Sequence, residues 1–179
     1  MNGDPTNVAT WGDADIYVSF DLEAATPADE DTPFSGDWEP IGILNGEAGI
    51  QEESSYTATP ITGWGWGTVA TGYSDFGDTW KFTAIEDNDI VWRLRHPNST
   101  APNISANHTP ERVLLAYEIR NGDTIKRKIC TGFATVVPDG AITIQEKGAA
   151  QTAFVASFYA DDSQNVFVEQ PADVGAPGS

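Results

Sequence analysis

The residues of this sequence that could carry out chemistry are two histidines, one cysteine and many carboxylates. His96 and His108 are too few and too isolated to predict a metal site or a catalytic relay. Cys130 is the only cysteine, which excludes an intrachain disulfide and a Cys-based zinc site, and we expect it to be a small core residue. No nucleophile stands in a pattern with a base. We therefore expect no enzyme activity, no cofactor and no metal.

The carboxylates dominate the charge of the chain. The sequence holds 27 acidic and 9 basic residues, for a net charge of −18, and residues 1–80 contain fifteen acidic residues and no Lys or Arg. Tight binding to nucleic-acid phosphates needs clustered cations, and the one basic cluster, at 126–128, splits across the two faces of an expected strand. Solubility is the simplest explanation of such a surface, and repulsion of polyanions is the more specific one.

Length and composition favour a single β-rich domain. A chain of 179 residues with 17 glycines, 11 prolines and many β-branched and aromatic residues is typical of short strands joined by turns. We expect one domain over residues 1–170, with a flexible N-terminal arm at 1–10 and a flexible tail at 171–179. The first residues do not form a secretory signal and no apolar stretch is long enough to span a bilayer, so we expect no contact with a membrane.

The clearest local signal is a hairpin over residues 113–131. Every second residue from 113 to 119 is apolar, which predicts a half-buried strand, and Asn121-Gly122 favours a turn. We expect a loop of odd length, because it keeps the isoleucines of the second arm on the face of Tyr117 and Ile119. That register places Lys126 beside or diagonal to Glu118. The expected scaffold residues are Tyr117, Ile119, Asn121, Gly122, Ile125 and Ile129.

One helix is expected, over about residues 87–96. Asp87 can cap its start, basic residues fill its last turn, and Pro97 ends it. The other periodic segments predict short strands, among them 14–21, 40–44, 78–85, 151–159 and 166–169. We therefore predict a mainly β fold, a β-sandwich or partly closed barrel with one short flanking α-helix and long loops.

Residues 54–75 break the strand pattern and are rich in Gly, Thr and aromatic residues. Within them lies a Gly-Trp-Gly-Trp-Gly run. A loop of this length is usually functional or ordered by a partner, and Trp and Tyr are preferred interface anchors. We expect a long assembly loop, with a twisted hairpin of partly buried indoles as the alternative. The candidate contacts between subunits or rings are Trp64, Trp66, Tyr73, Tyr56, Trp11 and Phe34.

Several segments between residues 38 and 169 follow one another in a specific order. They are Trp38-Glu-Pro-Ile-Gly-Ile-Leu-Asn-Gly46 leading into Gly49-Ile50, Ile61–Trp64, Gly67–Thr71, Thr79–Glu86, Pro110–Arg112, and Ala153–Tyr159 ending in Asp161–Asn165. In order and spacing they resemble the major tail tube protein of long-tailed, siphovirus-type bacteriophages. The Gly-Trp-Gly-Trp-Gly run departs from the sequence pattern of that family. None of the segments is a catalytic motif.

The resemblance implies a structural virion protein of a phage tail, assembled in the cytoplasm of a bacterial host. It implies hexameric rings that stack into a tube, with one sheet of each subunit joining an inner barrel. The implied partners are other copies of the chain, the tape measure protein in the lumen, and tail terminator and distal tail or tip proteins at the ends. Double-stranded DNA would pass without specific binding, since an acidic lumen gives weak phosphate contact. The candidate lumen acids are Glu47, Glu52, Glu53, Asp75 and Asp78.

Two other functions compete with this one. Six tryptophans and five tyrosines would suit a carbohydrate-binding β-sandwich module, in which aromatic rings stack on sugars. The lack of a secretory signal and of an attached catalytic domain counts against that module. Another ring-forming tail or neck protein is the third possibility.

Overall fold

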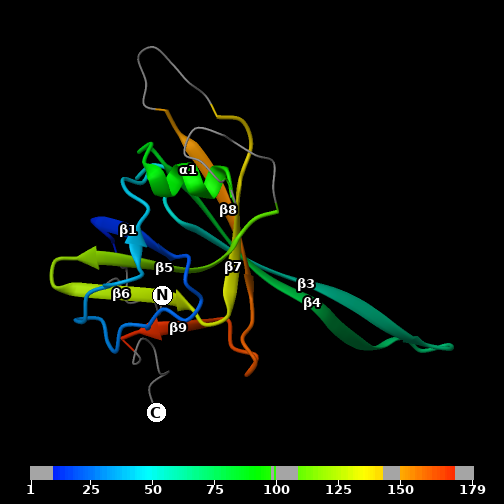
Figure 1. Cartoon of the computed structure of the whole chain (residues 1–179). Coiled ribbons are helices and arrows are strands. Elements are labelled where there is room, and N and C mark those ends of the chain that lie inside the picture. The colour runs from blue at the N-terminus through cyan, green and yellow to red at the C-terminus, as the bar shows by residue number, and fades with distance from the viewer. Residues whose placement is uncertain (1–9, 98, 100–108, 143–149, 172–179) are drawn as a thin grey trace.

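The computed structural model describes residues 10–97, 99, 109–142 and 150–171 (Figure 1). These residues are mainly β with one short helix, which confirms the predicted fold class. The expected arm at 1–10 and tail at 171–179 lie almost entirely outside the described residues. The strands are β1 (Asp13–Ser19), β2 (Glu39–Pro40), β3 (Gln51–Gly63), β4 (Gly67–Ala84), β5 (Arg112–Asn121), β6 (Thr124–Cys130), β7 (Phe133–Pro138), β8 (Thr152–Tyr159) and β9 (Phe167–Gln170), and the helix is α1 (Asp89–Arg95).

The strands of the described residues form one open antiparallel sheet that folds over at β5. In one half, β2, β1, β5, β6 and β9 lie in this order, and in the other β5 is followed by β7, β8, β4 and β3. β5 belongs to both halves because residues 116–121 pair with β6, whereas Arg112 and Val113 pair with β7. The chain crosses between the halves at Gly132, where a Cβ would clash with the carbonyl oxygen of Tyr159.

The two halves bury a core between them, and Trp80 of β4 lies at its centre. The centroid of its ring is 4.9 Å from that of Tyr117 in β5 and 5.2 Å from that of Phe167 in β9. The apolar face of β4 continues through Phe82 and Ala84, as its alternation predicts. Burying a side chain of the size of Phe82 contributes about 1.5–3 kcal/mol, so this face holds the two halves together.

Helix α1 packs Val91 and Leu94 into the core and is capped by Asn88. Oδ1 of Asn88 accepts a hydrogen bond from the Val91 amide at 2.9 Å, and its Nδ2 donates to the carbonyl of Ile41 at 2.8 Å. The prediction that Asp87 caps the helix is wrong. Asp87 lies one residue too early and pairs instead with Arg95 at 3.7 Å across the exposed face.

The loop between β5 and β6 differs from the predicted one. Asn121 pairs with Thr124, so the loop is Gly122-Asp123, and the prediction of an odd number of residues is wrong. Gly122 takes the left-handed conformation, with φ of 59°, that such a short hairpin loop needs. In this register Arg127, and not Lys126, lies opposite Glu118.

The register of the β5–β6 hairpin differs from the one that the apolar alternation predicted, because both faces of β5 are covered. Ile125 and Ile129 lie opposite Arg120 and Ala116, and therefore share the face of Glu118 instead of that of Tyr117. That face is covered by residues 20–37, so Glu118 is buried although its charge predicted exposure. Alternation identifies the register only where a single face is buried.

Residues 54–75 belong to strands β3 and β4 and are not a loop. The two strands pair from Gln51 and Lys81 out to Gly63 and Gly67, and the ribbon extends away from the rest of the molecule (Figure 1). Its turn is Trp64-Gly65-Trp66. The long assembly loop is therefore a wrong prediction of local structure, and the alternative, a hairpin, is confirmed, although its indoles are exposed.

A bulge interrupts the ribbon close to its base. Ser55 pairs with Gly77 and Thr57 with Ser74, so two residues of β4 stand opposite Tyr56 alone. One of these two, Asp75, has a φ of 55°, a conformation that Asp tolerates better than most residues. Bulges bend a strand and increase its twist, so this position sets the direction in which the ribbon leaves the core.

We predict that Asn88→Ala lowers the free energy of unfolding by about 1–2 kcal/mol, because it removes the side chain that caps α1. Asp87→Ala removes only an exposed ion pair and should change that free energy by less than about 0.5 kcal/mol. Urea unfolding followed by tryptophan fluorescence compares the two variants. A larger loss in Asp87→Ala than in Asn88→Ala would contradict the assignment of the cap.

Candidate functional site

The ribbon of β3 and β4 carries large apolar side chains that pack on no other part of the described chain. Their exposed fractions run from 54% for Ile61 to 101% for Trp64. Scattered apolar residues are normal on a protein surface, but seven exposed ones on a single projecting hairpin, spread over both of its faces, mark an interaction site. The group, called the ribbon surface below, consists of Tyr56, Ile61, Trp64, Trp66, Val69, Tyr73 and Phe76.

Three aromatic residues of the ribbon surface contact one another. The ring of Tyr56 lies 5.4 Å from that of Tyr73 and 6.3 Å from that of Phe76. These contacts stiffen the ribbon, but a two-stranded ribbon by itself is only marginally stable in water. The outer part of the ribbon therefore gains most from a partner that covers it.

The ribbon also stands out by its charge. No residue between Glu53 and Asp75 is charged, in a chain with a net charge of −18. Two copies of so acidic a chain repel each other wherever their charged surfaces meet. A neutral apolar ribbon is the part of the described surface that can approach a second copy with the least repulsion.

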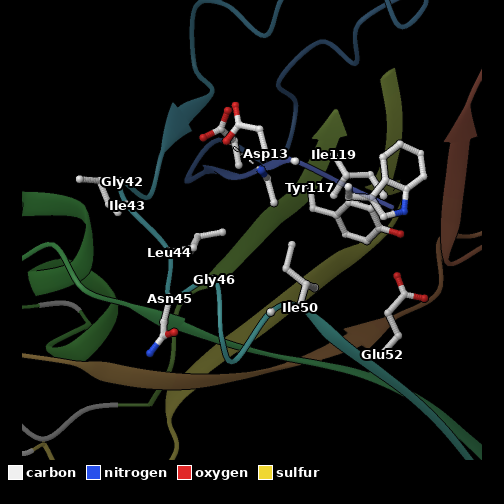
Figure 2. Close-up of a pocket in the computed structure, with 15 residues that line it drawn as sticks. Asp13, Gly42, Ile43, Leu44, Asn45, Gly46, Ile50, Glu52, Tyr117 and Ile119 are labelled. Atoms are coloured by element: carbon white, nitrogen blue, oxygen red, sulfur yellow. Dashed lines mark hydrogen bonds between the residues drawn. The ribbon is translucent and has the colours of Figure 1, made fainter. Parts of the chain in front are cut away.

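A groove of about 720 Å³ lies near the base of the ribbon, between β1, β5 and the segment that leads into β3 (Figure 2). Trp11, Ile50 and Tyr117 come to it from three separate segments of the chain. Burial and a hydrogen bond with Glu52 raise the pKa of Tyr117, so its hydroxyl stays neutral. Glycines leave the main chain uncovered along one side. The apolar residues that line the groove are Trp11, Ile43, Leu44, Ile50, Tyr117 and Ile119.

The carboxylates at this groove are paired within the chain. Asp13 and Asp15 contact Nη1 of Arg120 at 3.1 and 3.0 Å. Glu52 contacts Nζ of Lys128 at 2.8 Å. Each of these acids has a cation beside it, but Arg120 also pairs with Glu118 and Lys128 with Glu169, so the acids outnumber the cations and the groove keeps a partly negative rim around its apolar residues.

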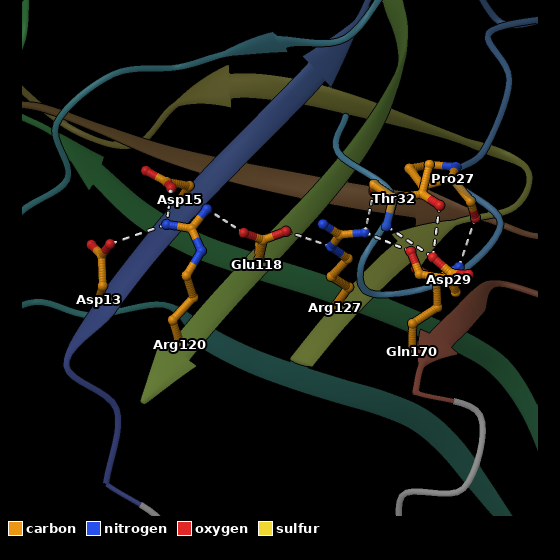
Figure 3. A network of polar contacts seen from close by, with 9 residues as sticks. All are labelled: Asp13, Asp15, Pro27, Asp29, Thr32, Glu118, Arg120, Arg127 and Gln170. Carbon is orange, nitrogen blue, oxygen red and sulfur yellow. Dashed lines mark hydrogen bonds and ion pairs between the residues drawn. The ribbon is translucent and has the colours of Figure 1, made fainter. Parts of the chain in front are cut away.

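Buried polar contacts continue from the groove into the sheet (Figure 3). Glu118 lies between two arginines and binds Nη2 of Arg120 with one oxygen and Nε of Arg127 with the other. Glu118 and Arg127 are 3% and 5% exposed. An ion pair shielded from water to this degree needs every partner in place, because either charge left alone in the interior is costly.

Arg127 also fastens the segment that covers this face of the sheet. Its Nη1 donates to the carbonyl oxygens of Asp29 and Thr32, both at 2.7 Å. At the end of β9, Nε2 of Gln170 donates to the carbonyl oxygen of Pro27 at 2.7 Å. The acidic segment 23–37 is therefore a fixed cover of the sheet and of the Glu118–Arg127 pair.

The predicted contact residues separate into three groups. Trp64, Trp66, Tyr73 and Tyr56 lie together on the ribbon surface. Trp11 lines the groove, with Nζ of Lys126 5.4 Å from its ring. Phe34 is partly buried and stacks on Tyr17 at 4.3 Å, so its contact with another subunit stays a prediction. Phe34 is needed where it is, because it covers the face of the sheet that holds Glu118 and Arg127.

The predicted lumen acids lie on the ribbon or just before it. Glu52 and Glu53 of β3 pair with Lys128 and Lys81 at 2.8 and 3.6 Å. Asp78 of β4 accepts a hydrogen bond from Ser54. Asp75 and Glu47 are exposed. The structure thus gathers these acids around the base of the ribbon, and their position in a lumen stays a prediction.

Sequence reasoning missed part of both surfaces. Ile61, Val69 and Phe76 of the ribbon and Ile43 of the groove are exposed apolar residues that were not among the predicted contact residues. One signal was available, since the uncharged stretch between Glu53 and Asp75 is unusual in so acidic a chain. The groove had no such signal, because segments distant in sequence form it.

Other kinds of site find no support in the part of the chain that the structure describes. There, no group of three or more His, Cys, Asp and Glu is arranged to hold a metal ion. Among the same residues, no helix is long and apolar enough to cross a membrane. Cys130 is 3% exposed, and burial raises the pKa of its thiol to about 11.

No model of a known protein family matches the chain, and no curated protein matches it either.

We predict that Arg127→Met lowers the free energy of unfolding by about 3–5 kcal/mol, because it leaves Glu118 buried without its partner. The double variant Glu118→Leu/Arg127→Met should lose less than the single one, since no lone charge remains at that position. Lys81→Met breaks the exposed pair with Glu53 and serves as the control, with a change below about 1 kcal/mol. Equal losses for Arg127→Met and Lys81→Met in urea unfolding would refute a buried pair.

We predict that Cys130 reacts slowly with iodoacetamide at pH 8 in the native protein and rapidly in urea. The thiolate is the reactive form, and both burial and the raised pKa keep its population low. Mass spectrometry of timed samples measures the labelled fraction. Labelling of the native protein at the rate of the unfolded one would show that β6 is not buried as described.

Proposed function

We propose that the chain is a structural subunit that assembles with its own copies into the tail tube of a long-tailed bacteriophage. The observation that carries the proposal is the ribbon surface, an uncharged apolar group on a projecting hairpin that the described residues of its own chain leave uncovered. Such a surface needs a partner to be stable. In the proposed assembly the partners are other copies, in hexameric rings that stack into a tube.

The sheet offers a second route to self-association. β3 stands at one end of the strand order, so its outer edge has main-chain donors and acceptors that no described strand takes up. Exposed edges of this kind pair readily with other chains. Pairing across copies would join the sheets into a closed wall, as the inner barrel of a tail tube requires.

The charge of the chain suits the proposed passage of DNA. A net charge of −18 gives no gain from counterion release, so DNA in a lumen lined by acids would slide without being held. The acids around the ribbon base, with Glu47, Asp75 and Asp78 foremost, are the proposed lumen residues. The tape measure protein would occupy the same channel before DNA, and tail terminator and tip proteins would close its ends.

We predict that the purified protein forms rings or tubes of constant width in electron micrographs. Replacing residues 56–76 with Asn-Gly joins Ser55 to Gly77, which already face each other, through a loop that favours hairpins. This variant should keep its fold, because the removed residues lie outside the core, and should remain a monomer. Circular dichroism and analytical ultracentrifugation test the two expectations separately.

A strict monomer at high concentration for the unaltered chain would overturn the proposal. The carbohydrate-binding alternative draws on one observation, the exposed rings of Trp64 and Trp66, which sugars could stack on. Binding of polysaccharide by that monomer, abolished in Trp64→Ala/Trp66→Ala, would favour the alternative. Tubes that the same double variant weakens would favour the tail tube.

A further inference from the structure

We propose that the groove near the base of the ribbon receives the ribbon tip of a second copy, so that copies bind head to tail. The tip is the turn Trp64-Gly65-Trp66 with the ends of the strands beside it. This inference rests on the proposed function for its partner, another copy of the chain, and adds the surface to which that partner binds.

The tip cannot reach the groove of its own chain. β3 runs for 13 residues from the groove to the tip, which corresponds to about 43 Å of extended strand. The groove lies at the opposite end, where Ile50 and Glu52 lead into β3. Strands that are paired along their length do not fold back, so only a second copy can place its tip there.

The character of the groove fits the tip. Its apolar residues offer contact to indole rings, and a volume of about 720 Å³ is in the range of sites that enclose a compact ligand. No atom lies within 4 Å of a Cβ built on Gly46 or Gly49, so this side of the groove has room for a bulky ring. The tip is convex, exposed and without a cover of its own among the described residues.

The charges around the groove also favour an uncharged segment, such as the tip, over a charged one. A cationic partner would have to compete with Arg120 and Lys128 for the carboxylates of Asp13, Asp15 and Glu52. An acidic segment would be repelled by a chain with a net charge of −18. A neutral apolar segment meets neither obstacle, and the stretch between Glu53 and Asp75 is such a segment.

A contact between tip and base is heterologous, because the two surfaces differ. Repeated contacts of this kind close into rings or continue as open helical stacks, according to the rotation between neighbours. Both outcomes agree with the proposed tube, whereas a contact between identical surfaces would end at a dimer.

Cysteine cross-linking between two separately purified variants tests the contact. Thr68→Cys places a thiol beside the tip and leaves both indoles intact, and Ile43→Cys places one at the groove, where the side chain is 62% exposed. Mixed under mild oxidation, the two should form a covalent heterodimer. Val168→Cys on β9, also exposed, is the matched control and should give none with Thr68→Cys. Cys130 is buried and should form no cross-link.

The second test measures the assembly of a variant in which the groove is blocked. Ile43→Arg adds a bulky charge at an exposed position and should raise the concentration needed for tubes about thirtyfold, the effect of losing one anchor residue at an interface. Val168→Arg is the control and should leave assembly unchanged. Unaltered tubes with Ile43→Arg, together with no cross-link, would overturn the groove contact and leave the tail tube proposal intact. Absence of tubes from the unaltered chain would overturn that proposal instead.

Discussion

The fold depends on one packing interaction, the contact of Trp80 with aromatic side chains from both halves of the sheet. In an open sheet that folds over at a single strand, the two facing halves share no further strand pairing, so side chains must hold them together. Trp80 comes from the half that carries the ribbon, and Tyr117 and Phe167 come from the other. The same side chain thus fixes the base of β4 while the outer part of that strand projects from the core.

Around that contact the molecule uses its polar residues in two different ways. Charges at the surface give the chain its acidity, whereas Glu118 and Arg127 lie under a covering segment and link β5 to β6. Arg120 extends this network to Asp13 and Asp15 of β1. Buried pairs of this kind add little net stability but penalise other arrangements strongly. The covering segment 23–37 looks like a solvated loop in sequence, and its carbonyl groups hold it in place.

Sequence reasoning predicted the fold class, a strand over residues 78–85, which is the inner part of β4, and the existence of the helix, because each shows a regular period. It missed the cap, since Asp87 and Asn88 are equally good caps and only position decides between them. The register of the β5–β6 hairpin was missed because both faces of β5 are covered. The ribbon was missed because a strand exposed on both sides has no apolar alternation to detect.

The bulge at Asp75 gives the ribbon a role beyond attachment. β4 is continuous from the tip to the core, so a tip held by a neighbour also fixes the orientation of the body behind it. The angle between successive copies would then be determined at the bend, by the left-handed backbone of one residue. In the proposed assembly these two properties would be separated in the chain: the apolar tip would decide whether copies join, and the bulge at Asp75, with the second irregularity beside Ile61, would set the pitch at which they repeat.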